Sequence, residues 1–160
     1  MLAKTNATRI LDRLDIPYEI LEYAVDDDDL GAEHVARQLS ITVDQTVKTL
    51  VVRGDRTGVF VCCLNGNREI DLKVLAAETG NRKVETIPAQ QLQSLTGYIR
   101  GGVSPIGMKK NFIILIDSKV LLEEKISMSA GKRGFQIWLS PDDLLKATGA
   151  EIKVFSREKT

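Results

Sequence analysis

Apolar and polar positions alternate along the chain with two different periods, and each period marks a different kind of element. Apolar residues recur at helical spacing in five segments, most of them bounded by a capping residue, a proline or a glycine. This combination predicts amphipathic helices with defined ends. Counted with their capping residues, the expected helices cover residues 6–14, 31–39, 71–80, 88–95 and 140–149.

Strand patterns fill most of the remaining chain. The expected strands cover residues 17–22, 47–53, 58–64, 83–87, 112–116, 126–129, 135–139 and 152–155. The segment 112–116 is apolar at every position, which is typical of a strand buried on both faces. So many strands exceed what one flat sheet holds comfortably. We therefore predict an α+β fold with a curved or barrel-like mixed sheet and peripheral helices, forming one domain over residues 1–160.

The charge balance limits the partners. Lys and Arg number 22 and Asp and Glu number 22, so the formal net charge is +0. Proteins that hold nucleic acid through their own field usually carry a basic excess, so any such contact needs a local patch or a second protein. No apolar run approaches the roughly 18 residues of a membrane span, and the start lacks the apolar core of a secretion signal. We expect a cytoplasmic protein with neither membrane nor DNA as a partner.

Several common site types lack their residues. The single histidine, His34, is expected on the solvent face of its helix, so a Ser-His-Asp or Cys-His arrangement would depend on that imidazole alone. Cys62 and Cys63 are neighbours on a strand and point to opposite faces, which excludes a paired metal site. The acidic run 26–29 lacks the spacing of a calcium loop and is expected to be solvated. We expect no metal and no cofactor.

The segment 96–107 carries the most information. It contains four glycines, a proline and a serine within twelve residues, so it is neither helix nor strand. Glycines allow positive φ and a close approach of backbone N–H groups to a ligand, while Tyr98 and Ser104 supply hydroxyl groups. The alternative is a long connector with unusual turns. Lys109 and Lys110, just beyond, favour an anionic ligand slightly.

Two further segments carry cations in suggestive places. Lys48 shares a strand face with Leu50 and Val52, so its ammonium either points into a pocket that supplies a partner or extends into water. In the turn 129–134, a Lys-Arg pair stands between two glycines, which suits either a phosphate or ribose clamp or an ordinary hairpin turn. No Gly-x-x-x-x-Gly-Lys-Ser/Thr run exists, so nucleotide hydrolysis by that route is not expected.

Taken in order, these segments resemble a known family. Lys48-Thr49, then Gly-Gly-Val-Ser-Pro-Ile-Gly at 101–107, then Ser-Ala-Gly-Lys-Arg-Gly at 129–134 are similar to the YbaK/EbsC family. That family comprises free-standing relatives of the bacterial prolyl-tRNA synthetase editing domain, and the similarity runs from about residue 16 to residue 150. It implies a mixed, strongly curved, barrel-like sheet of six to seven strands with peripheral helices.

The resemblance also implies an activity and partners. It implies trans-editing hydrolysis of the ester that joins a mischarged amino acid to the tRNA 3′ adenosine, most closely in the Cys-tRNA(Pro)/Cys-tRNA(Cys) deacylase branch. In that chemistry the cysteine thiol of the substrate attacks its own ester and leaves as a thiolactone, so no enzymic histidine is needed. The implied partners are the tRNA acceptor end and prolyl-tRNA synthetase.

Site residues follow from the resemblance and from the loop reasoning above. Lys48 matches the residue on which activity in the family depends, and the N–H groups of Gly101 and Gly102 are expected to stabilise the oxyanion. Leu30 falls where relatives carry an aromatic residue and Gln136 where some carry an acid. The substrate-binding candidates are Tyr23, Leu30, Thr49, Tyr98, Gly101, Gly102, Ser104, Ser129, Gly131 and Lys132.

Two alternatives stay open. The same fold can act on Ala-tRNA(Pro) or another small residue with a bound water as nucleophile, and S-alkylation of the charged cysteine separates that route from thiol attack. The chain can also be a non-catalytic module that binds tRNA or a synthetase. Such a module should tolerate Lys48→Ala, whereas a deacylase should not.

Overall fold

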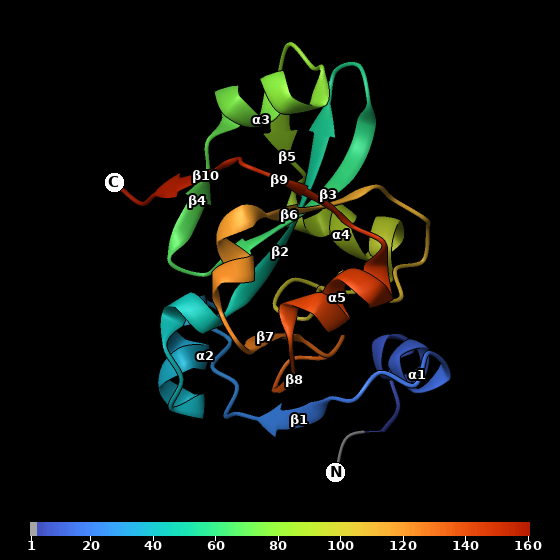
Figure 1. The fold of residues 1–160 in the computed structure, drawn as a ribbon, viewed down its shortest axis with the longest axis vertical. Helices are drawn as coiled ribbons and strands as arrows, with labels where there is room; N and C mark the ends of the chain where they lie inside the picture. The colour runs from blue at the N-terminus through green and yellow to red at the C-terminus, as the bar shows by residue number, and fades with distance from the viewer. Residues whose placement is uncertain (1–2) are drawn as a thin grey trace.

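Helices and strands alternate along residues 3–160, which the computed structural model describes (Figure 1). The helices are α1 (Asn6–Arg13), α2 (Ala32–Leu39), α3 (Leu72–Thr79), α4 (Ala89–Thr96) and α5 (Pro141–Thr148), with short 3-10 helices η1 (Val43–Gln45) and η2 (Ser118–Leu122). The strands are β1 (Glu19–Glu22), β2 (Val47–Gly54), β3 (Gly58–Asn65), β4 (Arg68–Ile70), β5 (Val84–Thr86), β6 (Ile114–Asp117), β7 (Ile126–Ser129), β8 (Phe135–Leu139), β9 (Glu151–Lys153) and β10 (Ser156–Glu158). No helix in this part of the chain is long and apolar enough to cross a bilayer.

Capping residues set the helix ends where the sequence predicts them. The side chains of Thr5, Asp71 and Ser140 each accept a hydrogen bond from the backbone N–H three residues further on, which satisfies a donor at the start of α1, α3 and α5. Gly80 and Gly149 end α3 and α5 in the left-handed conformation. The local signals for these helices are confirmed.

The strands form three sheets. The largest has the order β5-β2-β3-β6-β9, antiparallel from β5 to β3 and parallel from β3 to β9. A second sheet, β1-β8-β7, and a third, β10-β4, are antiparallel. One isolated parallel bridge, between Thr46 and Ser127, links the start of β2 to β7. At one end of the long axis lies α3, and α1 lies with β1 at the other (Figure 1).

The α+β class is confirmed, but the expected single barrel-like sheet is wrong. No continuous ladder passes from the large sheet to the β1-β8-β7 sheet, because only the bridge at Thr46 connects them. On the edge opposite to β3, β2 pairs with β5 only over residues 52–54. The sheets therefore remain open, and the first half of β2 keeps one edge without a neighbouring strand in residues 3–160.

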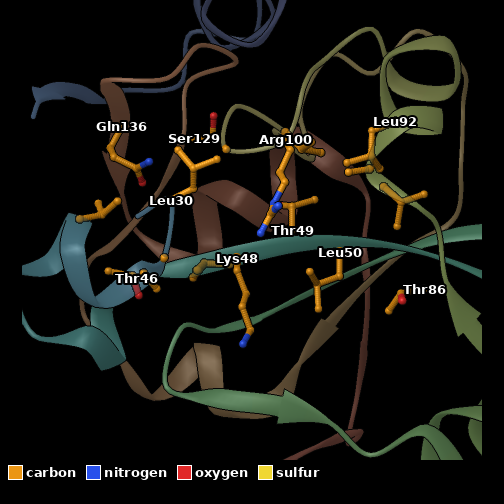
Figure 2. A pocket seen from close by; sticks show the side chains of 18 of the residues that line it. Leu30, Thr46, Lys48, Thr49, Leu50, Thr86, Leu92, Arg100, Ser129 and Gln136 are labelled. Carbon is orange, nitrogen blue, oxygen red and sulfur yellow. The ribbon is translucent and has the colours of Figure 1, made fainter. Parts of the chain in front are cut away.

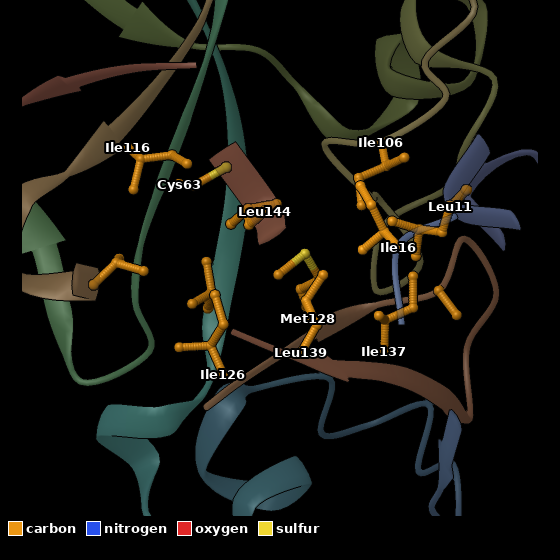
Figure 3. Packing of buried hydrophobic residues seen from close by; sticks show 14 residues of the cluster. Leu11, Ile16, Cys63, Ile106, Ile116, Ile126, Met128, Ile137, Leu139 and Leu144 are labelled. Atoms are coloured by element: carbon orange, nitrogen blue, oxygen red, sulfur yellow. The ribbon is translucent and has the colours of Figure 1, made fainter. Parts of the chain in front are cut away.

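Packing against both faces of the large sheet forms the core. One cluster fills the space between that sheet and the β1-β8-β7 sheet and includes Cys63, Leu11 from α1 and Leu144 from α5 (Figure 3). On the opposite face Cys62 packs with Leu75 of α3 in a second cluster. The two cysteines therefore point to opposite faces, as predicted. A third cluster packs α4 against β2 and β3.

Four local expectations are wrong. Ile113 is 62% exposed because β6 begins only at Ile114, and Leu72 is 46% exposed because it precedes the turn of α3 that reaches the core. The His34 side chain is only 12% exposed, since its ring packs edge-on against Tyr23 and its Nε2 lies 2.9 Å from the Ala24 carbonyl oxygen. Of the expected strand 152–155 only residues 152 and 153 are strand, in β9, and the next strand, β10, begins at Ser156 and pairs in a different sheet.

Candidate active site

A cavity of about 430 Å³ lies along the open edge of β2 (Figure 2). The Ile87 N–H donates to the Val51 carbonyl oxygen at 2.9 Å on this edge, where the β5 ladder stops short. Backbone groups of alternate residues in a strand point to the same side. The N–H and C=O of Thr49 therefore point along the open edge, toward the cavity that the edge lines.

Segments distant in the sequence wall the cavity. Tyr23 follows β1, Leu30 precedes α2, Gly101 lies in the glycine-rich segment, and Ser129 and Gln136 face it from the β7-β8 hairpin. Its polar side chains are hydroxyl groups, the Gln136 amide and two cations, and aliphatic residues, alanine and glycine complete the lining. No carboxylate, imidazole or thiol lines this cavity within residues 3–160.

Lys48 lies on one flank of the open edge. Its ammonium extends from the side of β2 opposite to Arg100 and Ser129 (Figure 2). As alternation predicts, it shares this face with Leu50, so the cavity wraps around the edge and touches both faces of the strand. The side chain is half-buried, which favours a pocket lysine over one whose ammonium is fully solvated.

The charge of Lys48 lacks a partner. Burial, with a smaller contribution from the nearby Lys159, lowers the pKa of its ammonium to about 8, and Glu69 partly opposes this shift. Glu69 already pairs with Arg157 at 2.9 Å. Within residues 3–160 no hydrogen bond or ion pair reaches the Lys48 ammonium. A half-buried cation without a counter-charge is a binding position for an anionic or strongly polar ligand group.

Gly101 occupies a position that only glycine fits. Its φ is +83°, and the Gly102 N–H donates to the Ile99 carbonyl oxygen at 2.8 Å across the turn 99–102. A Cβ at residue 101 would lie 3.1 Å from Arg133 Nε and 3.3 Å from both methyl groups of Leu30. This turn bond engages the Gly102 N–H, which makes Gly101 the better candidate of the two, and the expected oxyanion roles of both stay predictions.

Arg133 fixes the turn from the neighbouring hairpin. Its Nε donates to the Arg100 carbonyl oxygen at 2.8 Å, and its guanidinium contacts the Asp27 carboxylate at 3.3 Å. One side chain thus joins the β7-β8 hairpin, the glycine-rich segment and the acidic loop that precedes α2. The cavity wall is held by contacts between loops that local sequence cannot specify.

Other candidates of the glycine-rich segment lie outside the cavity lining. The Tyr98 hydroxyl donates to the Ile106 carbonyl oxygen at 2.7 Å, and burial raises its pKa to about 12. Buried Ser104 accepts a hydrogen bond from the Ile106 N–H at 3.3 Å. Both hydroxyl groups hold the second half of the segment in place. Their role as substrate contacts, like that of Gly102, stays a prediction.

The candidates in the hairpin turn 129–134 also differ in whether they line the cavity. Ser129 lines the cavity and accepts a hydrogen bond from the Gly131 N–H at 3.1 Å. Gly131 itself has φ +99° and packs so closely that a Cβ would lie 2.7 Å from the Tyr98 ring. Lys132 is exposed, with its ammonium 5.7 Å from the centre of the Phe135 ring. Gly131 and Lys132 do not line the cavity, and their proposed substrate contacts stay predictions.

Among the lining residues that were not sequence candidates for substrate binding, Gln136 and Arg100 carry an amide and a charge. Gln136 is buried, and its Oε1 accepts a hydrogen bond from the Ser127 hydroxyl at 2.8 Å, which leaves its amide N–H groups to the cavity side. Arg100 carries the second cation of the lining. Its place directly before a glycine in a tight turn is the signal that would have found it.

Neither the cysteine thiols nor the histidine of the described residues suits a nucleophilic or metal site in this cavity. Burial raises the pKa of both the Cys62 and Cys63 thiols, that of Cys63 to about 12, so both stay protonated. His34 lies outside the cavity lining. Within residues 3–160 no three His, Cys, Asp or Glu side chains gather as a metal ion would require. The cavity can bind and orient a ligand, but its lining holds no carboxylate or imidazole base.

The sequence profile of the aminoacyl-tRNA editing domain family matches residues 30–147. The chain belongs to this family. Within it, a protein of Enterococcus faecalis, provisionally named Cys-tRNA(Pro)/Cys-tRNA(Cys) deacylase EbsC, is 45% identical over 148 residues, covering 92% of this chain and 90% of that protein. The proline–tRNA ligase of Lactococcus lactis is 31% identical over 103 residues, which are 64% of this chain and 16% of the ligase.

Solved structures share the fold over almost the whole chain. The hypothetical protein APE2540 superposes with a TM-score of 0.87 at 23% identity, covering 96% of this chain and all 100% of that one. A protein provisionally described as a trans-editing enzyme for prolyl-tRNA synthetase gives a TM-score of 0.82 at 22% identity, covering 98% and 99% of the two chains. At these identities the comparisons show the fold.

Proposed function

We propose that this protein is an aminoacyl-tRNA deacylase that removes cysteine from Cys-tRNA(Pro), and also from Cys-tRNA(Cys), in trans. The similarity to the Enterococcus protein supports the substrate class, because 45% identity extends over most of both chains. The observation that carries the mechanism is the composition of the cavity. Two cations and no carboxylate, imidazole or thiol line it, which favours a nucleophile supplied by the substrate itself.

The substrate cysteine supplies the nucleophile in this proposal. Its thiolate sulfur forms a bond to the ester carbonyl carbon, the bond between that carbon and the ribose oxygen breaks, and the ribose oxygen takes a proton from water. The products are a small thiolactone and uncharged tRNA. A thiol with a pKa near ~8.5 is partly ionised at neutral pH. Attack within one molecule has a high effective concentration, so the protein need only hold a folded, near-attack pose.

The lining residues take complementary roles. The Gly101 N–H and the open-edge N–H of Thr49 are backbone donors for the developing oxyanion. Lys48, whose charge has no partner in the described protein, anchors the terminal adenosine through its ribose or phosphate. Tyr23, Leu30 and Ser129 surround the amino acid. Serine is similar in size to cysteine, but its hydroxyl stays protonated, so discrimination between the two is chemical.

Selection of the tRNA is assigned to a second protein. A net charge of +0 gives little general attraction to RNA, and the chain resembles a segment of proline–tRNA ligases. We infer a ternary complex with prolyl-tRNA synthetase that presents the mischarged tRNA. The isolated protein should therefore bind tRNA weakly in physiological salt. A nanomolar Kd for the isolated protein under those conditions would contradict this part of the proposal.

A deacylation panel tests the activity. Rates are measured on Cys-, Ala-, Ser- and Pro-charged tRNA with the wild type and with Lys48→Ala. We expect fast release of cysteine, slow release of the other three, and loss of activity in the variant. Equal release of alanine would favour a water-based deacylase instead. Unchanged function of Lys48→Ala would favour a non-catalytic binding module.

A further inference from the structure

Arg100 stands at the mouth of the cavity and is exposed, whereas most of the lining is at least half-buried. Its guanidinium points toward the edge of β2 near Thr49, from the opposite side to the Lys48 ammonium (Figure 2). The two cations therefore flank the open edge, one half-buried and one at the entrance. We propose that Arg100 binds a phosphodiester of the tRNA acceptor strand. This inference rests on the proposed deacylase function.

The charge of Arg100 is available for a ligand. The nearby acidic loop is engaged elsewhere, because Asp27 contacts Arg133 at 3.3 Å and Asp29 contacts Arg37 at 3.6 Å. No ion pair or side-chain hydrogen bond reaches the Arg100 guanidinium within residues 3–160. No carboxylate lines the cavity either, so nothing in the lining competes with an anion.

The backbone of Arg100 is held in place although its side chain is exposed. Its carbonyl oxygen accepts the bond from Arg133 Nε at 2.8 Å, and the positive φ of the next residue, Gly101, defines the turn. Such anchoring lowers the entropy lost when the guanidinium binds. The planar guanidinium matches the two terminal oxygens of a phosphodiester with two parallel hydrogen bonds.

The order of groups in the substrate agrees with the order of the cavity. When the cysteinyl ester lies between Gly101 and Thr49, the ribose of the terminal adenosine follows it outward. The phosphate that joins this adenosine to the preceding nucleotide then comes next, at the entrance. Arg100 is the exposed cation of the lining, so in this proposal it binds that phosphate of the RNA chain.

A substrate series tests this assignment. Cysteine is esterified to adenosine, which has no phosphate, to adenosine 5′-phosphate, and to tRNA, and each is given to the wild type, Arg100→Gln and Arg100→Lys. For Arg100→Gln we expect KM to rise about tenfold on the two phosphate-bearing esters, with kcat unchanged and with no change on the adenosine ester. Arg100→Lys keeps the charge without the two-bond geometry and should fall between. Arg82→Gln removes an exposed cation outside the cavity lining and serves as the matched control.

Binding of an uncharged acceptor-stem RNA provides a second readout that does not need catalysis. Arg100→Gln should weaken this binding about tenfold. The slope of log affinity against log salt concentration should also fall, by the amount that corresponds to about one phosphate contact. An equal loss on the adenosine ester, or unchanged KM and binding throughout, would overturn the assignment. If the wild type cleaves no cysteinyl ester but Arg100→Gln still weakens RNA binding, the deacylase proposal fails and the phosphate contact stands.

Discussion

Two groups of residues in the glycine-rich segment 96–107 differ in what they contribute. Arg100 and Gly101 form a turn whose exposed groups line the cavity, whereas Tyr98 and Ser104 are buried and bond to the backbone of Ile106. In the sequence, both groups combine polar side chains with nearby glycines, so both look equally suited to bind a ligand. A hydroxyl group that is already bonded to the protein supports the site, whereas a cation or backbone N–H without a partner, close to the open edge of β2, forms it.

The largest expected effect is at Lys48, one of the residues that line the cavity. Lys48→Met should lower kcat/KM on Cys-tRNA at least about 100-fold, because it removes the cation that anchors the adenosine. It should not lower the free energy of unfolding at pH 7, since burial disfavours the charged ammonium. Chemical denaturation and steady-state kinetics measure the two effects. Lys125→Met, at an exposed position outside the lining, is the control and should retain activity.

The pH dependence should show the same residue. Since the pKa of Lys48 is lowered to about 8, its ammonium is charged below that pH and loses its charge as the pH rises through it. We expect kcat/KM to fall above pH 8, by up to about tenfold per pH unit. Lys48→Arg stays charged at all these pH values and should lose this descending limb. The same descending limb in Lys48→Arg would assign the titration to another group.

Gly101 and Gly102 form a matched pair within one turn. Gly101→Ala combines a positive φ with contacts of 3.1 Å and 3.3 Å, so it should destabilise the fold by about 1–2 kcal/mol and lower activity. Gly102→Ala meets its neighbours at 3.4 Å or more without a positive φ and should change both much less. Thermal unfolding and deacylation rates measure the difference. Equal losses in the two variants would remove the distinction between these neighbouring positions.

The smallest effect on activity is expected at Tyr98, which supports the glycine-rich segment through its bond to the Ile106 carbonyl. Tyr98→Phe leaves the buried Ile106 carbonyl without its 2.7 Å hydrogen bond, which should cost about 1 kcal/mol of stability. The kcat/KM on Cys-tRNA should stay unchanged, because the hydroxyl does not line the cavity. Urea denaturation and deacylation kinetics measure the two quantities. A specific loss of kcat without loss of stability would place Tyr98 in the site.

Local signals predicted the elements well, but the arrangement of the sheets depends on distant pairing. Thr5, Asp71 and Ser140 cap helices through bonds to residues three positions away, which the sequence alone can show. By contrast, Glu19 of β1 pairs with Trp138 of β8, and no local pattern specifies that partner. The open edge of β2, and with it the cavity, results from such pairing.

The site itself was predictable only in part, for the same reason. Lys48 and Gly101 stood out by residue type and by family resemblance, and both line the cavity. Whether Tyr98 is a ligand or a support depends on the position of the Ile106 carbonyl, which only the fold provides. Arg100 enters the cavity lining through the turn 99–102, which the glycine after it signals, whereas Gln136 enters through the β7-β8 hairpin and its neighbours in sequence do not reveal this.

The cavity has no carboxylate or imidazole base in its lining and, in the proposed mechanism, relies on the sulfur of its substrate. The most direct test compares tRNA(Pro) charged with cysteine and with 2-aminobutyrate, which is nearly the same size but carries a methyl group in place of the thiol. We expect the wild-type protein to release cysteine at least about 100-fold faster than 2-aminobutyrate. Release of both amino acids at similar rates would contradict it and would show that water attacks the ester.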